Sequence, residues 1–285
     1  NNNNYKIETS TQSFLLKVYL DKMYKHIVYE TKLLLYLKQE SFLTAAPLPN
    51  RLGKYITTYG ITNIVLFEFL SGTEPKINEN SVSLVAENLS RLHIIKPSRR
   101  YKRKSFTGIE SCRLLARMLP MVPPYIQFVD YFITFTELFL PFQKVKIQQG
   151  LTHGDLFTNN TVLTGNGNLA FIDFENSSFS NLLYDLGIAI NGFCFLNHTI
   201  NWNLVKVFIT KYLETSILNY DEKDLLGIYI IAGVHGIIGW HIKLMLERPK
   251  SNERHIERIT YLIERVKTLW SNRLHIERQL ATILK

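Results

Sequence analysis

Three polar residues in the second half of the chain have the types and the spacing of a phosphoryl-transfer site. Asp155 follows a His-Gly pair, and Asn160 comes five residues later. Asp173 ends an apolar run another thirteen residues on. Phosphoryl transfer requires a carboxylate that orients the attacking hydroxyl and takes its proton, and oxygen ligands that hold Mg²⁺ against the phosphates. The spacing therefore predicts a general base at Asp155 and magnesium ligands at Asn160 and Asp173.

The same chemistry requires a cation that pairs with the phosphates of the nucleotide, and Lys17 fits this role. Lys17 lies in a segment whose apolar residues alternate, which indicates a strand, and Glu30 lies in the helix predicted to follow. Each residue has a plain structural alternative, because strand lysines and helix carboxylates are usually solvated. Asp155 and Asp173 have one too, as turn or cap residues. The combined pattern favours the catalytic interpretation over four independent structural ones.

These motifs resemble those of the aminoglycoside phosphotransferase and choline kinase superfamily, which shares the protein-kinase fold. The run His-Gly-Asp-x-x-x-x-Asn is similar to the catalytic loop of that superfamily, and Ile-Asp-Phe is similar to its metal-binding segment. The resemblance implies an ATP-dependent kinase in which Asp155 is the catalytic base and Asn160 and Asp173 bind Mg²⁺. It gives His153 a structural role, in which hydrogen bonds from the ring hold the loop.

The first part of the chain resembles the nucleotide-binding part of the same superfamily. By this resemblance, Lys17 contacts the phosphates and Glu30 is the carboxylate that pairs with it. Residues 66–72 resemble the hinge between the two lobes of a kinase. There the backbone of Glu68 and Leu70 is expected to meet the edge of the adenine.

Four more residues receive supporting roles. Asp185 lies in a Tyr-Asp-Leu segment that is similar to one in the family, and it is expected to support or cap the site rather than to catalyse. His93 ends a helix pattern common in the family and is interpreted as a packing residue. The chain begins inside what resembles the nucleotide loop, so Asn3 and Asn4 are candidates for facing the phosphates. A flexible terminus is the alternative for these asparagines.

One branch of the superfamily, the bacterial homoserine kinases of the aminoglycoside-phosphotransferase type, resembles the chain over nearly its whole length and most strongly over 151–195. It implies a small-molecule hydroxyl substrate, with homoserine as the first choice. Two departures lie near the expected acceptor. Thr158 and Asn159 stand where the family often has a charged pair, and Asn191 precedes Gly192 where the family has an acidic residue. Asn159 and Asn191 are therefore candidate substrate contacts.

The periodicity of apolar residues predicts an α+β chain with a small β-rich lobe at 1–72 and a larger helical lobe at 73–285. In the first lobe we predict strands at 5–9, 13–19, 54–58 and 64–69, a helix at 21–39 and a break at 47–49. In the second lobe we predict helices at 81–93, 108–118 and 125–140, a hairpin of 161–164 with 169–174, and mainly helix after 182. This is the element order of a kinase-like, two-lobed fold.

Composition narrows the classes of protein. The 285 residues are 46% hydrophobic, which supports a folded core, and the two cysteines are far apart, which gives no disulfide framework or zinc site. The chain opens on asparagines and shows no signal peptide, so we expect a cytoplasmic enzyme. Residues 225–242 carry no formal charge, yet their glycines and histidines favour a buried helix over a membrane span.

Two other acceptors within the superfamily remain open. An aminoglycoside would require an acidic pocket, and the chain is not enriched in acidic residues beyond Asp185. A choline-like or ethanolamine-like acceptor would require aromatic side chains around a cation. Trp202, Tyr229 and Trp240 could supply them, although aromatic residues at helical spacing usually belong to the core.

The sequence bears on two further classes of function. A catalytically inactive nucleotide-binding regulator is disfavoured, because Lys17, Asp155, Asn160 and Asp173 are all retained. The net charge of +9 fits either nucleic-acid binding or a field that attracts nucleotides. The basic run at 99–104 has no accompanying RNA-binding aromatic motif and is interpreted as a solvated segment, so no nucleic-acid partner is expected. The oligomeric state cannot be predicted from these residues.

Overall fold

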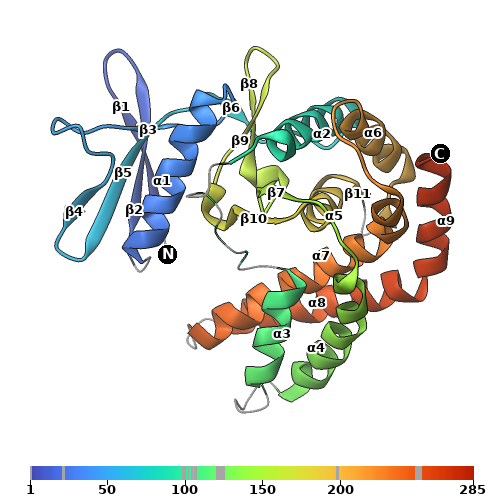
Figure 1. Ribbon diagram of the computed structural model, residues 1–285. Helices are drawn as coiled ribbons and strands as arrows, with labels where there is room; N and C mark the ends of the chain where they lie inside the picture. Colours follow the sequence, from blue (N-terminus) through green and yellow to red (C-terminus); the bar gives the residue numbers. More distant parts are fainter. Residues whose placement is uncertain are drawn as a thin grey trace.

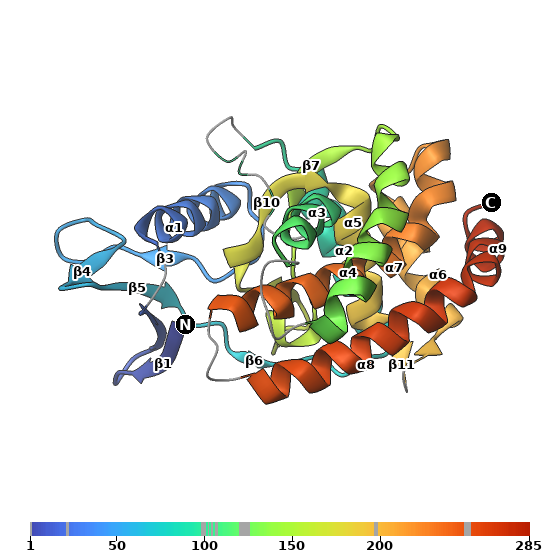
Figure 2. The same cartoon turned by 90° about the horizontal axis from the view of Figure 1, so that it is seen from below.

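A computed structural model of the chain describes residues 2–20, 23–97, 101, 103, 105, 108–119, 126–196, 199–247 and 252–285. An antiparallel sheet with one helix against it forms one end of the molecule, and a larger, mainly helical part forms the other (Figure 1). Seen from below, the two parts again lie side by side, with β7 and β10 between them (Figure 2). The predicted α+β class is confirmed.

The first sheet is built from the amino-terminal strands in the order β1-β2-β5-β3, with β4 paired to β5. Its strands are β1 (Asn2–Glu8), β2 (Ser13–Tyr19), β3 (Pro47–Leu48), β4 (Thr57–Tyr59) and β5 (Thr62–Glu68). The hairpin predicted around residues 10–12 is present, although β1 begins at Asn2 rather than at Tyr5. The central strand β2 carries Lys17, so a neighbour on each side fixes the position of this side chain.

The predicted break at 47–49 is wrong in one respect. Pro47 and Leu48 form the short strand β3, which pairs with Phe67 and Leu66 of β5. Proline has no N–H to donate, and it is tolerated because β3 lies at the edge of the sheet and Pro47 is its first residue. The prolines predict a break in the chain, and the strand is recognised only from its pairing with β5.

Helix α1 (Tyr24–Gln39) lies along the first sheet (Figure 1). Its buried stripe contains Ile27, Leu34 and Leu37, which recur at the spacing of one helix face. Glu30 lies on the same stripe and is 1% exposed. A carboxylate is rarely buried unless it is paired. The position of Glu30 within an apolar stripe therefore indicates a specific partner on the sheet.

The carboxyl-terminal part contains eight α-helices among the residues described. They are α2 (Glu79–Ile94), α3 (Ile109–Met118), α4 (Ile126–Phe139), α5 (Leu182–Phe193), α6 (Trp202–Leu213), α7 (Tyr220–Glu247), α8 (Asn252–Ser271) and α9 (Arg273–Ile283). Helix α7 is central, because α3, α4, α5, α8 and α9 all pack against it. It is long and apolar enough to span a membrane, but 78% of its most apolar window is buried inside the protein, as in a core helix.

Two small sheets carry the loops of the predicted site. Strand β7 (Gln149–Thr152) pairs with β10 (Ser178–Asn181), and β6 (Gly72–Thr73) pairs with β8 (Thr161–Thr164), which pairs with β9 (Leu169–Phe171). The predicted hairpin is therefore present. Strand β9 ends at Phe171 and not at 174, because Asp173 adopts a left-handed backbone that ends the strand.

Candidate active site

The predicted catalytic loop leaves the end of β7 and turns sharply at Gly154. Gly154 has a φ of +81°, in the left-handed region that favours glycine. A Cβ atom at this position would lie 2.7 Å from the carbonyl oxygen of Asn176. The loop can therefore pass close to the segment after β9 only with glycine at this position, and this approach brings Asp155 toward Asp173.

His153 fixes the conformation of the loop through hydrogen bonds of its ring. Its Nε2 donates to the carbonyl oxygen of Ile172 at 2.9 Å, and its Nδ1 accepts the backbone N–H of Asp155 at 3.3 Å. With these two partners, Nε2 acts as a donor and Nδ1 as an acceptor. The ring is fully buried and has no open position for a substrate. This geometry is the supporting arrangement expected for His153.

Asp185, near the start of α5, holds the backbone of the catalytic loop. Its two oxygens accept the N–H groups of His153 and Gly154, each at 2.8 Å. The Nε2 of His93 donates to the same carboxylate at 3.1 Å, and Tyr212 lies 2.8 Å from the other ring nitrogen. Burial alone would raise the pKa of Asp185, but the hydrogen bonds from His93 and Gly154 lower it below its ordinary value. The interpretation of His93 as a mere packing residue is therefore wrong.

Asp155 itself is half-buried at the mouth of the loop. Burial raises the pKa of its carboxyl above the ordinary value; His153 opposes this shift, and the nearby charge of Asp173 adds to it. Asn160 donates from Nδ2 to the backbone carbonyl of Asp155 at 2.7 Å, and Asn176 lies 3.4 Å from the carboxylate. Sequence reasoning missed Asn176, because a lone asparagine after Asp173 carries no motif.

Lys17 reaches across the boundary between the two parts. Its Nζ lies 3.0 Å from Glu30 and 2.9 Å from Asp173, so one cation joins α1 to the loop after β9. Burial alone would lower the pKa of Lys17, but the two carboxylates outweigh it and raise the pKa well above its ordinary value. The predicted Lys17–Glu30 pair is present, with the hydroxyl of Tyr19 at 3.3 Å from the second oxygen of Glu30.

Asp173 has the backbone of a strained residue. Its φ of 60° and ψ of 62° lie in the left-handed region, which only glycine, asparagine and aspartate visit routinely. This turn directs the carboxylate toward Lys17. Burial and the neighbouring Glu175 raise the pKa of Asp173, although Lys17 acts in the opposite direction. One lysine is therefore paired with two carboxylates, Glu30 and Asp173, and Glu175 adds a further negative charge nearby.

The donor set of the site fits a magnesium ion. Asn160 uses its amide nitrogen to hold the loop, which leaves its oxygen as an acceptor, and Asp173 supplies a carboxylate on the facing segment. Within the part of the chain that is described, no three His, Cys, Asp or Glu side chains cluster closely enough to hold a metal by themselves. Oxygens of phosphates and water would complete the shell, as is usual for Mg²⁺.

Glu175 is a second residue that sequence reasoning missed. It lies two positions after Asp173, and Asn2 of β1 donates to its carboxylate at 3.0 Å. The contact joins the first strand of the sheet to the loop after β9. Its position two residues after Asp173, the predicted metal ligand, was the available signal.

The hinge prediction can be sharpened. The backbone N–H of Glu68 donates to the carbonyl of Ala46 at 2.9 Å, so only its carbonyl could meet an adenine. Its side chain pairs with Lys38 on α1. Leu70 follows the end of β5 and lies outside every strand, where its backbone N–H could serve a ligand.

The two asparagines predicted to face the phosphates point in opposite directions. Asn4 stands opposite Lys17 in the register of β1 and β2, so the two side chains share one face of the sheet. Asn3 lies on the other face, where its amide is 3.4 Å from the hydroxyl of Tyr5 and is exposed. The prediction for Asn3 is therefore wrong, because side chains alternate along a strand.

The candidate substrate residue Asn191 does not face an acceptor. Its amide donates to the carbonyls of Gly187 and Ile230, at 2.8 and 2.7 Å, and its oxygen accepts from Arg265 at 2.9 Å. These bonds use its whole polar end to join α5, α7 and α8, so the prediction for Asn191 is wrong. Asn159 is exposed on the catalytic loop.

A small cavity of about 80 Å³ opens beside Asp155. Apolar side chains from the loop, α5 and α7 form its walls, namely Phe157, Ile188, Ile237 and Trp240. Tyr229 is buried in the core and Trp202 packs against His275, so neither joins Trp240 at this cavity. The three aromatic residues therefore do not form a cage.

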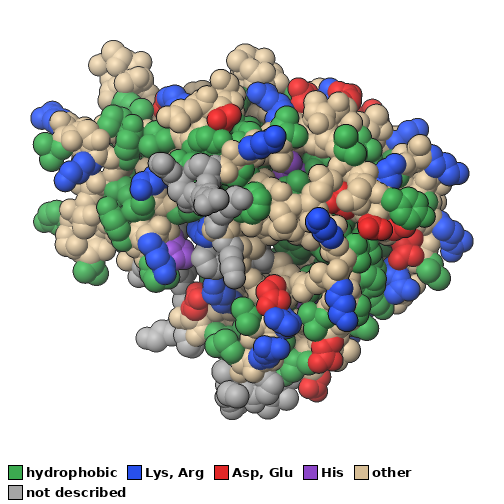
Figure 3. Space-filling view, in the orientation of Figure 1, with side chains coloured by type: hydrophobic (Ala, Val, Ile, Leu, Met, Phe, Trp, Pro, Cys, Tyr) green, Lys and Arg blue, Asp and Glu red, His purple; other side chains and the backbone are tan. Residues whose placement is uncertain are grey.

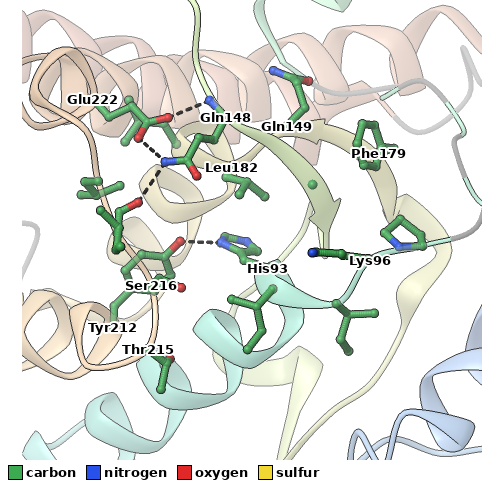
Figure 4. Close-up of a pocket in the computed structure, with 17 residues that line it drawn as sticks. His93, Lys96, Gln148, Gln149, Phe179, Leu182, Tyr212, Thr215, Ser216 and Glu222 are labelled. Atoms are coloured by element: carbon green, nitrogen blue, oxygen red, sulfur yellow. Dashed lines mark hydrogen bonds between the residues drawn. The ribbon is translucent and has the colours of Figure 1, made fainter.

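A larger cavity, of about 590 Å³, lies behind the catalytic loop (Figure 4). His93 points into it from the end of α2, and Tyr212, Ser216 and Glu222 line the opposite side. Glu222 is occupied by hydrogen bonds from Gln148 and from the backbone of Asn219. This space is separate from Asp155 and Lys17, although His93 touches both the cavity and Asp185.

On the face shown in Figure 3, lysines and arginines are spread among apolar and acidic groups. Of the basic run, Arg99, Arg100, Lys102 and Lys104 lie outside the described residues. Arg103 is not solvated as expected, because its guanidinium lies 4.1 Å over the ring of Tyr29.

The fold and the site together define a kinase-like phosphotransferase. The sequence model of the phosphotransferase enzyme family matches residues 1–201, so the chain belongs to this family. The protein named homoserine kinase in Rhodopseudomonas palustris (strain BisB18) is 26% identical over 230 residues, which are 79% of this chain and 71% of that protein. The predicted membership of the superfamily and the predicted similarity to homoserine kinases are confirmed. The prediction that the protein is a kinase with a hydroxyl acceptor is confirmed as well.

Solved structures show the same fold at lower identity. An amicoumacin kinase in complex with AMP-PNP and Ca²⁺ superposes with a TM-score of 0.72 at 15% identity, covering 94% of this chain and 85% of that one. The choline kinase LicA from Streptococcus pneumoniae gives a TM-score of 0.64 at 16% identity, covering 93% and 89%. The predicted kinase-like fold is thus confirmed.

Proposed function

We propose that this phosphotransferase uses ATP and Mg²⁺ to phosphorylate the hydroxyl of a small metabolite, with homoserine as the first candidate. One observation supports this most directly. The ion pair between Lys17 and Asp173, at 2.9 Å, joins the first sheet to a loop that also touches Asp155. A phosphate-binding cation, a metal-binding carboxylate and a general base thus converge from three parts of the chain.

Each residue has a defined task in the transfer. Asp155 orients the acceptor hydroxyl and takes its proton, and its raised pKa makes it a stronger base than an ordinary carboxylate. Lys17 pairs with the phosphates and is itself oriented by Glu30. Asn160 and Asp173 would hold Mg²⁺, which supplies charge neutralisation at the phosphates. Similarity to an enzyme solved with AMP-PNP and Ca²⁺ is consistent with a nucleotide and a divalent cation at this position.

The remaining assignments follow the same plan. The carbonyl of Glu68 and the N–H of Leu70 would meet the adenine, and Asn4 would lie near the phosphates. Residues 1–72 and 73–285 would act as the two lobes, since the chain passes from the first sheet to β6 between Glu68 and Gly72. A cytoplasmic location would fit a supply of ATP.

The acceptor pocket favours a small molecule. The cavity beside Asp155 is about 80 Å³ and apolar, and Asp155 is its only acidic side chain among the described residues. A polycationic aminoglycoside would require more negative charge. A choline-like cation would require aromatic side chains around it, and Phe157, Tyr184 and Trp240 line this cavity, so choline or ethanolamine is the second candidate. Relatives named homoserine kinase favour the compact amino-acid alcohol.

A phosphotransfer screen tests the proposal. Purified protein is incubated with γ-labelled ATP, Mg²⁺ and, separately, homoserine, an aminoglycoside, choline, ethanolamine and a hexose. We expect acceptor-dependent transfer to homoserine above all others. Transfer to choline or ethanolamine instead would replace the acceptor and keep the mechanism. Thermal stabilisation by ATP with no transfer to any acceptor would favour a nucleotide-binding regulator.

A further inference from the structure

Arg103 holds the loop that carries the metal-binding residue. Its Nη2 donates to the carbonyl of Glu175 at 2.6 Å, and its Nε donates to the carbonyl of Ser177 at 3.1 Å. Both acceptors belong to the turn that follows Asp173. The guanidinium therefore binds this turn through the backbone, independently of which side chains the turn carries.

The turn from Asp173 to Ser177 contacts two other parts of the site, Lys17 and Asp155. Asp173 pairs with Lys17, and Asn176 lies 3.4 Å from the carboxylate of Asp155. A small rotation of this turn would displace the metal-binding carboxylate and the neighbour of the general base together. Its position therefore decides whether the two aspartates act on the same phosphoryl group.

Arg103 also ties this turn to helix α1. Its guanidinium lies 4.1 Å from the centre of the Tyr29 ring, a cation–π contact. The hydroxyl of Tyr29 donates to the carbonyl of Tyr101 at 3.1 Å, and the carbonyl of Arg103 accepts the N–H of Phe179 at 2.9 Å. Tyr29 directly precedes Glu30, the partner of Lys17.

We propose that Arg103 is a positioning residue that sets the distance between the Lys17–Glu30 pair and the metal-binding turn. This inference rests on the proposed nucleotide and metal site and adds a residue outside its motifs. Arg103 fixes the turn from one side through two carbonyls and α1 from the other through the Tyr29 ring. Asp173 is thereby held where Lys17 and a metal can both reach it.

Arginine suits this position better than lysine. Its planar guanidinium has several N–H donors in a fixed fork, so it can bind two carbonyls while its face lies on an aromatic ring. A lysine has the same charge but only one nitrogen. Arg103→Lys therefore separates the geometry of the contact from its charge.

The test measures nucleotide binding by titration calorimetry for the wild type, Arg103→Lys and Arg103→Ala, with AMP-PNP as the probe. Each protein is titrated once with Mg²⁺ present and once with a chelator. We expect both variants to bind AMP-PNP roughly 10- to 100-fold more weakly with Mg²⁺, the usual loss when a group that orients a metal ligand is removed. Binding without metal should change little.

Arg113→Ala is the matched control, because Arg113 forms an exposed ion pair with Glu110 on α3. It should bind AMP-PNP like the wild type under both conditions. Equal weakening of the Arg103 variants with and without Mg²⁺ would show a general structural role and overturn the inference. So would wild-type behaviour of Arg103→Lys. A wild type that does not bind AMP-PNP at all would instead overturn the proposed function, on which the inference rests.

Discussion

At the scale of residues, the site concentrates negative charge around one lysine. The charges of Asp173 and Glu175 raise the pKa of Asp155, and Lys17 pairs with both Asp173 and the buried Glu30. Carboxylates held close together repel one another, which disfavours their ionised form unless a further cation binds. A divalent metal would offset this negative charge, so we expect it to bind together with the nucleotide.

Replacing the general base tests the chemistry without disturbing the fold. Asp155→Asn keeps the size of the side chain and removes the proton acceptor, so we expect kcat to fall by roughly 10²- to 10⁴-fold. Nucleotide binding should be retained, as measured by thermal stabilisation with ATP. Turnover close to that of the wild type would remove Asp155 from the role of base.

The pH profile of the wild type gives an independent reading of the same residue. A base must be deprotonated to act, and the pKa of Asp155 is raised by burial and by the charge of Asp173. An ordinary carboxylate titrates near pH 4. We therefore expect kcat/KM for the acceptor to begin to fall at a pH above this value as the solution is made more acidic. A flat profile down to that pH would contradict the assignment.

The backbone of Asp173 decides which substitution is informative there. Its left-handed conformation suits asparagine but strains alanine, so Asp173→Asn removes the charge without that cost. We expect the Mg²⁺ concentration for half-maximal activity to rise at least about tenfold, the scale on which metal sites respond to altered ligation. An unchanged magnesium dependence would exclude Asp173 as a ligand.

At the scale of elements, α5 and α7 pack backbone against backbone. A Cβ at Gly187 would lie 2.3 Å from the carbonyl oxygen of Tyr229, and α5 also carries Asp185. The loop, α5 and α7 therefore form one packed unit, in which Asp185 links the catalytic loop to the core of the molecule.

This packing predicts the effect of one methyl group. Gly187→Ala should lower the free energy of unfolding by about 1–3 kcal/mol, because helix backbones must separate to admit it. Gly165→Ala is the control, since Gly165 lies in the β8–β9 turn with open space around it. Urea denaturation of both variants checks the prediction, and equal stability would contradict the close approach.

The sequence predicts most elements and the central motif, because both depend on local patterns. Helix α2 and strand β2 follow from the spacing of apolar residues, and Asp155, Asn160 and Asp173 follow from a motif. The residues that sequence reasoning missed or misread, such as His93, Asn176 and Arg103, gain their roles from partners distant in the chain. Asn191 was misread for the same reason, since its partner Arg265 lies on a different helix.

At the scale of the whole molecule, Asp185 couples stability to pH. Its pKa in the folded protein lies below the ordinary value, so its ionised form stabilises the fold at neutral pH. This contribution is complete above the unfolded pKa, near 4, and is lost as the pH falls through the lower, folded value. The free energy of unfolding should therefore fall in acid partly through this one carboxylate.

Asp185→Asn tests that coupling. Removing one partner from a buried charged network should reduce the free energy of unfolding by roughly 3 kcal/mol at pH 7. The difference from the wild type should begin to shrink below the unfolded pKa, near 4, and should close only when the pH passes the lower folded pKa, where the wild-type carboxylate also becomes neutral. Asp130→Asn, an exposed site on α4, is the control. Urea denaturation across this pH range gives the measurement, and a pH-independent difference would contradict the coupling.

The position of Trp240 provides a natural optical reporter. Of the three tryptophans, all within the described residues, Trp240 alone lines the cavity beside Asp155, and it is 40% exposed. Trp202 packs on His275, and Trp270 packs on Phe135 and Phe139. An acceptor that enters the cavity should therefore change the intrinsic fluorescence chiefly through one indole. Binding of unlabelled alcohols can then be followed directly, before any phosphate is transferred.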